Sequence, residues 1–315
     1  MDDEIVYDAF VSLVVPVYRS AQILPKLTET VESVMHGRPF ELILVCDASP
    51  DDSWEVIRDL TARYSFVRGI CLRKNAGQHN AIMAGLAHVR GGLVVLMDDD
   101  LQHPPSEIPS LLKALEAGAD VCYVNYLQRR HALWKRLGSK INDIAATLLL
   151  GKPHSLYLSS FKALKRPIVE EIIRYDGPFA YVDGLILDAT SAITSVDILH
   201  SERYLGEGNY SLRRSVSLWL KMATSFSVFP LRVLFVLGLV VAMASVLAIA
   251  GLAYFKWTNP DLPIGWASTI AAILFVGGLQ MLGLGLLGEY LGRAYMKLNH
   301  KPQYVVREVI PTPVA

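Results

Sequence analysis

The chain has 315 residues, of which 52% are apolar and 19% are charged, and this excludes an intrinsically disordered protein. Its 30 Lys and Arg residues balance its 30 Asp and Glu residues, so no global positive field indicates a nucleic acid partner. The three cysteines lie in separate apolar runs without metal-ligand spacing, and the acidic start of the chain does not fit a cleavable signal peptide. We therefore expect reduced thiols and a domain that faces the cytoplasm.

Apolar, β-rich runs alternate with helical periods over the first 125 residues. Five runs predict strands, and these are Val11–Tyr18, Glu41–Asp47, Val67–Arg73, Gly92–Asp98 and Ala119–Asn125. Such nearly continuous apolar runs are typical of strands that are buried on both faces, and the segment around Ile108–Leu115 has helical spacing. The pattern predicts an α/β domain with an open, mainly parallel sheet that binds ligands at the carboxyl ends of its strands. Beyond Asn125 the alternation fades into a basic stretch, and after that stretch we expect a loop region up to about Arg203.

Carboxylates follow two of these strands, and no Gly-rich dinucleotide or P-loop motif is present. Asp47 ends the second strand, and Asp98, Asp99 and Asp100 close the fourth. Acidic residues at positions i and i+2 of an extended turn can share one Mg²⁺ or Mn²⁺ ion, which prefers oxygen ligands. A solvated acidic turn that caps the helix near Pro104 explains the same residues equally well.

Two basic segments follow the predicted sheet. The first contains Arg129, Arg130, His131, Lys135, Arg136 and Lys140. The second, Leu212–Phe229, also carries aromatic residues and fits a helix that lies along a membrane surface. These cations suit a phosphate ligand or an anionic lipid surface, and a solvated basic face is the structural alternative.

Two long runs near the end of the chain contain no charged residue. They comprise the 23 residues 233–255 and the 27 residues 262–288, and each is long enough for a bilayer core of roughly 30 Å. Basic residues flank the outer ends of this pair, namely Arg213, Arg214, Lys221, Arg232, Arg293, Lys297, Lys301 and Arg307. The positive-inside rule then predicts two membrane helices, about 233–255 and 264–288, with both termini cytoplasmic. Buried helices of a large soluble domain are the alternative.

Three motifs together carry a resemblance to a known family. They are VPVY at Val15–Tyr18, VCDASPD at Val45–Asp51, and NAGQHNAIMAGLAHVRGGLVVLMDDDLQHPP at Asn75–Pro105. The chain resembles the family 2 glycosyltransferases of the GT-A fold. It is more narrowly similar to the polyprenyl-phosphate glycosyltransferases, which include dolichyl-phosphate mannose synthases and bacterial undecaprenyl-phosphate aminoarabinose and glucosyl transferases. The tail Leu286–Ile310 is similar to that of the membrane-bound bacterial members, so the resemblance covers nearly the whole chain.

The resemblance implies an inverting glycosyltransferase in the bacterial inner membrane. It would move a sugar from a nucleotide diphosphate, with UDP preferred and GDP open, to undecaprenyl phosphate or a similar polyprenyl phosphate. The implied nucleotide pocket contains Pro16, Tyr18, Asp47 and Asp98, with Asp47 at the base. The implied site for Mg²⁺ or Mn²⁺ contains Asp98, Asp100 and Gln102. His79 and His103 flank this site, and we expect them to support it rather than to bind the metal.

The resemblance also implies residues for the acceptor phosphate. They are Arg129, Arg130, Lys135, Arg136, Ser159, Lys162 and Arg203, and the candidate catalytic residues are Asp98, Asp100, Arg129 and Lys162. Ser159 and Lys162 belong to the stretch Tyr157–Arg166, which matches the family's S-G-F-R region.

The chain departs from the family pattern at several positions. Cys46 stands where the family usually has an acid, and Arg19 stands where it commonly has Asn. Gly208 and Asn209 replace the Ser and Lys of a family loop. Leu156 stands where many relatives have an Asp that is proposed as a base. A phosphate monoester has a second pKa near ~6, so the attacking oxygen needs no base at neutral pH. Asp176 and Asp183 are possible substitutes, although we favour structural roles for both.

These observations predict four segments. Residues 1–205 form the cytoplasmic GT-A domain, residues 206–231 a juxtamembrane amphipathic segment, residues 232–292 the two membrane helices and residues 293–315 a cytoplasmic tail. The expected partners are a nucleotide sugar, a polyprenyl phosphate and membrane lipid, and the resemblance implies a homo-oligomer, a tetramer. Two other functions stay open, a processive polysaccharide synthase, whose Q-x-x-R-W motif is missing, and a non-catalytic membrane scaffold or translocation partner.

Overall fold

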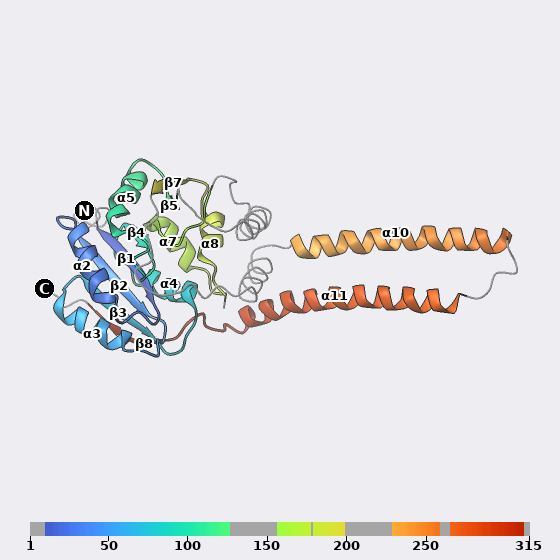
Figure 1. Ribbon diagram of the computed structural model, residues 1–315, viewed down its shortest axis with the longest axis horizontal. Helices are drawn as coiled ribbons and strands as arrows, with labels where there is room; N and C mark the ends of the chain where they lie inside the picture. Colours follow the sequence, from blue (N-terminus) through green and yellow to red (C-terminus); the bar gives the residue numbers. More distant parts are fainter. Residues whose placement is uncertain (1–9, 127–155, 178, 199–228, 259–264, 312–315) are drawn as a thin grey trace. The chain divides into compact units, whose positions relative to one another are not determined.

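The structure is a computed structural model, and it describes residues 10–126, 156–177, 179–198, 229–258 and 265–311 (Figure 1). The chain divides into two compact units. Unit 1 is Met1–Ser211 with His300–Ala315, and unit 2 is Leu212–Asn299. The predicted catalytic residues that the structure describes all lie in unit 1.

Unit 1 is built on one eight-stranded sheet in the order β7-β5-β6-β4-β1-β2-β3-β8. The strands are β1 (Val11–Val17), β2 (Phe40–Cys46), β3 (Val67–Leu72), β4 (Leu93–Leu96), β5 (Val121–Tyr126), β6 (Lys162–Lys165), β7 (Ile193–Ile198) and β8 (Val306–Ile310). Neighbouring strands are parallel except at β6, which runs antiparallel to β4 and β5, and at β8, which runs antiparallel to β3. The sheet is therefore mixed and mostly parallel, as predicted.

Helices cover both faces of this sheet. One apolar cluster joins it to α2 (Leu24–Val34), α3 (Ser53–Arg63) and α5 (Ile108–Glu116), with the short 3₁₀ helix η1 (Pro105–Glu107) before α5. A second cluster joins it to α4 (Gln78–Leu86), α7 (Arg166–Ile173) and α8 (Val182–Ala189). Alternate residues of β1 divide between the clusters, with Leu13 and Val15 in the first and Val14 in the second. The burial of both faces explains why the central strands have nearly continuous apolar sequences.

The five predicted strands and the predicted helix near Ile108 are confirmed, with ends that differ by at most two residues. β1 pairs with β2 on one side and with β4 on the other. All three strands run in the same direction, so their carboxyl ends meet at one edge of the sheet.

The loop region expected between the basic stretch and about Arg203 is wrong for the part that the structure describes, residues 156–177 and 179–198. This part of the chain contains β6, α7, α8 and β7. β6 has only four residues, and it lies between β4 and β5 in the sheet. It is a strand because it pairs with both neighbours, not because it has a long apolar sequence. β7 is an edge strand whose residues are mostly half-buried or exposed. Both strands therefore lack the apolar signal on which the prediction depended.

The segment after the second long helix returns to the sheet as β8. Its backbone pairs with β3, and the Arg58 guanidinium donates to both carboxylate oxygens of Glu308 at 2.8 and 3.0 Å. The Arg307 guanidinium lies 5.8 Å from the centre of the Trp54 ring. The tail predicted for residues 293–315 therefore contains a strand that the sequence does not predict.

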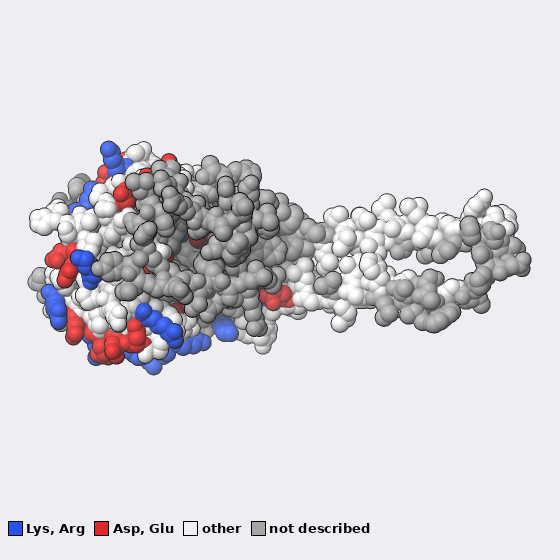
Figure 2. Space-filling view, viewed as in Figure 1, with Lys and Arg blue, Asp and Glu red and all other residues white. Residues whose placement is uncertain are grey.

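Unit 2 contains two long helices in its described part, α10 (Phe229–Thr258) and α11 (Trp266–Leu298). Large apolar side chains along both helices are exposed, among them Phe235, Leu247 and Leu291. On the face shown in Figure 2, the described surface of this unit is almost free of charged side chains. Within the described residues, no helix combines the length and the apolar character that a membrane span requires.

Candidate active site

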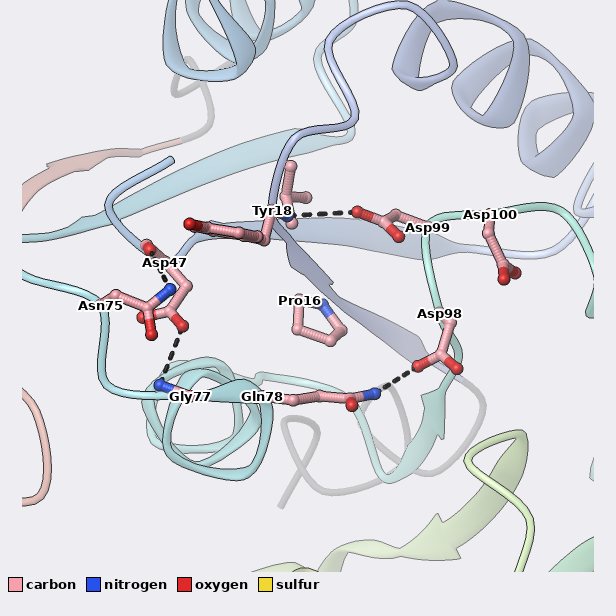
Figure 3. Close-up of a pocket in the computed structure, with 10 residues that line it drawn as sticks. Pro16, Tyr18, Asp47, Asn75, Gly77, Gln78, Asp98, Asp99 and Asp100 are labelled. Atoms are coloured by element: carbon pink, nitrogen blue, oxygen red, sulfur yellow. Dashed lines mark hydrogen bonds between the residues drawn. The ribbon is translucent and has the colours of Figure 1, made fainter. Parts of the chain in front are cut away.

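A cavity of about 410 Å³ opens at the carboxyl ends of β1, β2 and β4, beside the start of α4. It is lined by Pro16, Val17, Tyr18, Asp47, Asn75, Gly77, Gln78, Asp98, Asp99 and Asp100, most of which are labelled in Figure 3. All four residues predicted for the nucleotide pocket belong to this lining, and so does Asp100 of the predicted metal site. Asn75, Gly77 and Gln78 are not among the predicted site residues, although they lie in a motif that carries the resemblance.

The turn after β1 is fixed by its backbone N–H groups, because four successive ones donate to side-chain oxygens of other segments. The pairs are Tyr18 N with Asp99 Oδ2 at 3.2 Å, Arg19 N with Ser49 Oγ at 2.7 Å, Ser20 N with Ser53 Oγ at 3.2 Å and Ala21 N with Asp51 Oδ2 at 3.2 Å. Arg19 has a positive φ of 60°. The turn therefore presents Tyr18 to the cavity on a backbone that the segments after β2 and β4 hold in place.

Asp47 holds the loop that leads into α4. Its Oδ1 accepts a hydrogen bond from Ala76 N at 2.7 Å, and its Oδ2 accepts one from Gly77 N at 2.9 Å. Burial raises the pKa of the Asp47 carboxyl, and these two hydrogen bonds act in the opposite direction. Gly77 has a φ of 88°, which a residue with a side chain rarely adopts. The carboxylate thus shapes the backbone that lines the cavity.

The acidic turn after β4 directs its three carboxylates in two directions. In Figure 3 the Asp98 and Asp100 side chains extend to one side of the turn, whereas Asp99 extends towards Tyr18. Burial raises the pKa of Asp99 to about 6, and the neighbouring Asp98 and Asp100 charges add to this shift. Asp100 Oδ1 accepts the backbone N–H of Gln102 at 3.0 Å, so the third predicted metal residue adjoins the turn. The arrangement separates Asp99, which holds the turn after β1, from Asp98 and Asp100, which extend the other way.

The donor set suits a hard divalent cation that is shared with a ligand. In the described residues, no group of three or more His, Cys, Asp or Glu side chains could enclose a metal ion. Asp98 and Asp100 line the same cavity and offer only oxygen. Mg²⁺ commonly binds through one or two carboxylates and completes its shell with substrate phosphates and water. The two carboxylates therefore fit an ion that a bound diphosphate helps to hold.

The predicted acceptor residues are placed differently. Ser159 and Lys162 are described and buried, and neither lines the cavity. Ser159 Oγ accepts a hydrogen bond from Phe161 N at 3.1 Å. Arg129, Arg130, Lys135, Arg136 and Arg203 lie outside the described residues. The structure thus brings together the residues predicted for the nucleotide and does not place the predicted acceptor residues beside them.

Lys162 belongs to a buried ionic group at the start of β6. Its ammonium pairs with Asp183 Oδ1 and lies 4.9 Å from the centre of the Tyr123 ring. The Tyr123 hydroxyl donates to the same carboxylate oxygen at 2.9 Å. His79, which packs edge-on against Tyr181, has a pKa that burial lowers. These contacts fit the structural role that we favour for Asp183.

The profile of glycosyl transferase family 2 matches residues 12–173, which include every described residue of the cavity. The chain belongs to glycosyl transferase family 2. A second profile, described as the GtrB C-terminal hairpin, matches residues 229–294 of this glycosyl transferase, which include α10 and most of α11.

Curated relatives cover almost the whole of this glycosyl transferase. An undecaprenyl-phosphate 4-deoxy-4-formamido-L-arabinose transferase of Serratia proteamaculans is 35% identical over 305 residues, which are 95% of this chain and 94% of the relative. The transferase of the same name from Yersinia enterocolitica is 33% identical over 305 residues, 95% of this chain and 93% of the relative. The family expected from the three motifs is thereby confirmed.

Solved structures confirm the GT-A-like fold of this glycosyl transferase. Glucosyl-3-phosphoglycerate synthase from Mycobacterium tuberculosis, solved in complex with Mn²⁺, UDP-glucose and phosphoglyceric acid, matches with a TM-score of 0.52. The match has 20% sequence identity and covers 69% of this chain and 78% of the synthase. At this identity the likeness concerns the fold alone.

Proposed function

We propose that this glycosyl transferase moves a sugar from a nucleotide diphosphate donor to undecaprenyl phosphate. The observation that carries the proposal is the cavity at the carboxyl ends of β1, β2 and β4, which Asp98 and Asp100 line together with Tyr18 and Asp47. The similarity to undecaprenyl-phosphate transferases over 95% of the chain supports the choice of acceptor.

In the proposed reaction, an oxygen of undecaprenyl phosphate attacks the anomeric carbon of the sugar. The bond between that carbon and the donor phosphate oxygen breaks with inversion, and the nucleoside diphosphate leaves with the electron pair. The acceptor phosphate is already largely deprotonated at neutral pH, so the site needs to position and neutralise charge rather than remove a proton.

The cavity residues divide these tasks. We assign the nucleotide to Pro16, Tyr18 and Asp47, with UDP as the preferred diphosphate. We assign Mg²⁺ or Mn²⁺ to Asp98 and Asp100, with Gln102 beside them, and a bound ion would neutralise the charge of the leaving diphosphate. The acceptor phosphate is assigned to the basic residues after β5, to Arg203 and to the Ser159–Lys162 segment.

We also propose that α10 and α11 hold the enzyme in the bacterial inner membrane, with the catalytic unit and both termini cytoplasmic. Support comes from the uncharged runs 233–255 and 262–288, from the basic residues that flank them, and from the exposed apolar side chains of both helices. The match to the GtrB C-terminal hairpin also supports this role of the two helices. A homo-oligomer, a tetramer by resemblance to membrane-bound relatives, belongs to this proposal.

The direct test compares the wild-type chain in detergent with Asp100→Asn. We expect the wild type to bind UDP in a Mn²⁺-dependent manner and to transfer sugar, and the folded variant to lose transfer. A folded Asp100→Asn chain with wild-type transfer would refute the metal assignment. A wild-type chain that binds no nucleoside diphosphate, with or without metal, would instead support a non-catalytic scaffold.

A further inference from the structure

Asp98 is held by three side chains from separate parts of the fold. Gln78 Nε2, at the start of α4, donates to Asp98 Oδ1 at 2.6 Å, and Ser160 Oγ, just before β6, donates to Oδ2 at 2.7 Å. The Asp98 backbone N–H donates to His103 Nδ1 at 3.1 Å. Both carboxylate oxygens and the backbone of one residue of the cavity are thus fixed at the same time.

The direction of these hydrogen bonds follows from the contacts of His103. Because His103 Nδ1 accepts the Asp98 N–H, the neutral ring carries its proton on Nε2. That nitrogen lies 3.3 Å from Ser160 Oγ, so it donates to the hydroxyl, and the single hydroxyl proton goes to Asp98 Oδ2. His103 Nε2 itself is 3.9 Å from Asp98 Oδ2, which is too long for a direct hydrogen bond. The serine therefore links the ring to the carboxylate.

The packing around His103 keeps the hydrogen bonds among His103, Ser160 and Asp98 in one geometry. The ring stacks on Phe161, with 5.3 Å between ring centres and 14° between planes, and only 7% of the residue is exposed. Phe161 is fully buried and follows Ser160 directly in the chain. The stack therefore fixes the segment that carries the serine to the turn that carries Asp98.

We propose that His103 and Ser160 are positioning residues for Asp98, which hold its carboxylate in the orientation that binds the diphosphate and its divalent cation. This inference rests on the proposed function, because it concerns how the same cavity holds the donor. Each carboxylate oxygen accepts one of these hydrogen bonds and keeps a further lone pair for a ligand. Loss of either bond would let the side chain rotate away from the cavity.

Ser160→Ala tests the inference, with Mn²⁺ affinity of the full chain in detergent measured by electron paramagnetic resonance in the presence of UDP. We expect the affinity to fall about 10- to 100-fold, as for other groups that orient metal ligands. Ser160→Thr, which keeps the hydroxyl, should retain most of the affinity. Ser12→Ala is the matched control. Ser12 Oγ also donates to a buried carboxylate, that of Glu41 at 2.6 Å, but neither residue lines the cavity. It should leave Mn²⁺ affinity unchanged.

His103→Asn tests whether the ring acts through the serine. Asn can still accept the Asp98 N–H, but it removes the donor to Ser160, so its loss of affinity should not add to that of Ser160→Ala. Urea unfolding midpoints confirm that each variant is folded. Wild-type affinity in a folded Ser160→Ala chain, or full additivity in the double variant, would overturn the inference while leaving the proposed function intact. Absence of Mn²⁺ binding in the wild type would overturn both.

Discussion

The backbone N–H of Tyr18 donates to Asp99 Oδ2 at 3.2 Å, although the two residues are 81 positions apart in the chain. This bond joins the turn after β1 to the acidic turn after β4. The middle carboxylate of the motif therefore supports Tyr18, which lines the cavity, while Asp98 and Asp100 extend the other way.

Asp99→Asn should stabilise the metal-free protein at neutral pH. The folded-state pKa of Asp99 is raised to about 6 from the usual 3.8, so ionisation opposes folding, and stability is lost as pH rises between these values. Asn keeps an oxygen acceptor for Tyr18 N. We expect a gain in unfolding free energy of about 1–3 kcal/mol above pH ~7 that disappears below pH ~4. Urea unfolding across this range, followed by Trp fluorescence, measures it, and a gain independent of pH would contradict the assignment.

Asp47→Asn should weaken both the loop before α4 and nucleotide binding. An amide has one acceptor oxygen, so it cannot satisfy Ala76 N and Gly77 N together, and one partly buried N–H loses its partner. We expect a loss of about 1–3 kcal/mol in unfolding free energy and weaker UDP binding by calorimetry. The exposed Asp52 provides the control, since Asp52→Asn should change neither quantity. Unchanged UDP binding in folded Asp47→Asn would remove this residue from the nucleotide site.

Lys162→Met should destabilise the protein by about 3–5 kcal/mol, because it leaves the Asp183 carboxylate buried without its cation. The double variant Lys162→Met/Asp183→Leu should recover most of the lost stability, since it removes both charges. We predict that the double variant, although stable, will still lack sugar transfer, because in our proposal Lys162 also serves the acceptor phosphate. Wild-type transfer in that variant would leave Lys162 with a structural role alone.

Gly85→Ala should destabilise the contact between α4 and the sheet. A Cβ atom at this position would lie 2.3 Å from Val14 Cγ1 and 3.0 Å from Val45 Cγ2. The overpacking outweighs the higher helix propensity of Ala, and we expect a loss of about 1–3 kcal/mol in unfolding free energy. Adding Val14→Ala should restore part of it. A Gly85→Ala chain as stable as the wild type would show that α4 can shift freely on the sheet.

The sequence predicted the parts of the fold that local patterns encode. Strands β1 to β5 are apolar and are buried by helices on both faces, so their composition alone reveals them. β6 and β8 owe their existence to partners far along the chain, β4 and β5 in one case and β3 in the other. Four or five residues of mixed polarity carry no such signal.

The site also contains residues that the sequence predicts and contacts that it does not. Tyr18, Asp47, Asp98 and Asp100 were identified because they follow predicted strands within motifs of the family. The contact of Ser160 with Asp98 spans 62 positions, and it depends on the antiparallel entry of β6 beside β4. Neither the motif nor the spacing predicts that contact, and the same holds for the pair of Lys162 and Asp183.

Transfer to lipid is the most direct test of the proposed function. The purified chain is incubated with Mg²⁺ or Mn²⁺, undecaprenyl phosphate and a panel of labelled UDP- and GDP-sugars, and label extracted into organic solvent is counted. We predict label that requires both the metal and the lipid phosphate, with one donor strongly preferred. Absence of extractable label across the panel, from a folded chain that also fails to bind UDP and GDP, would contradict the account.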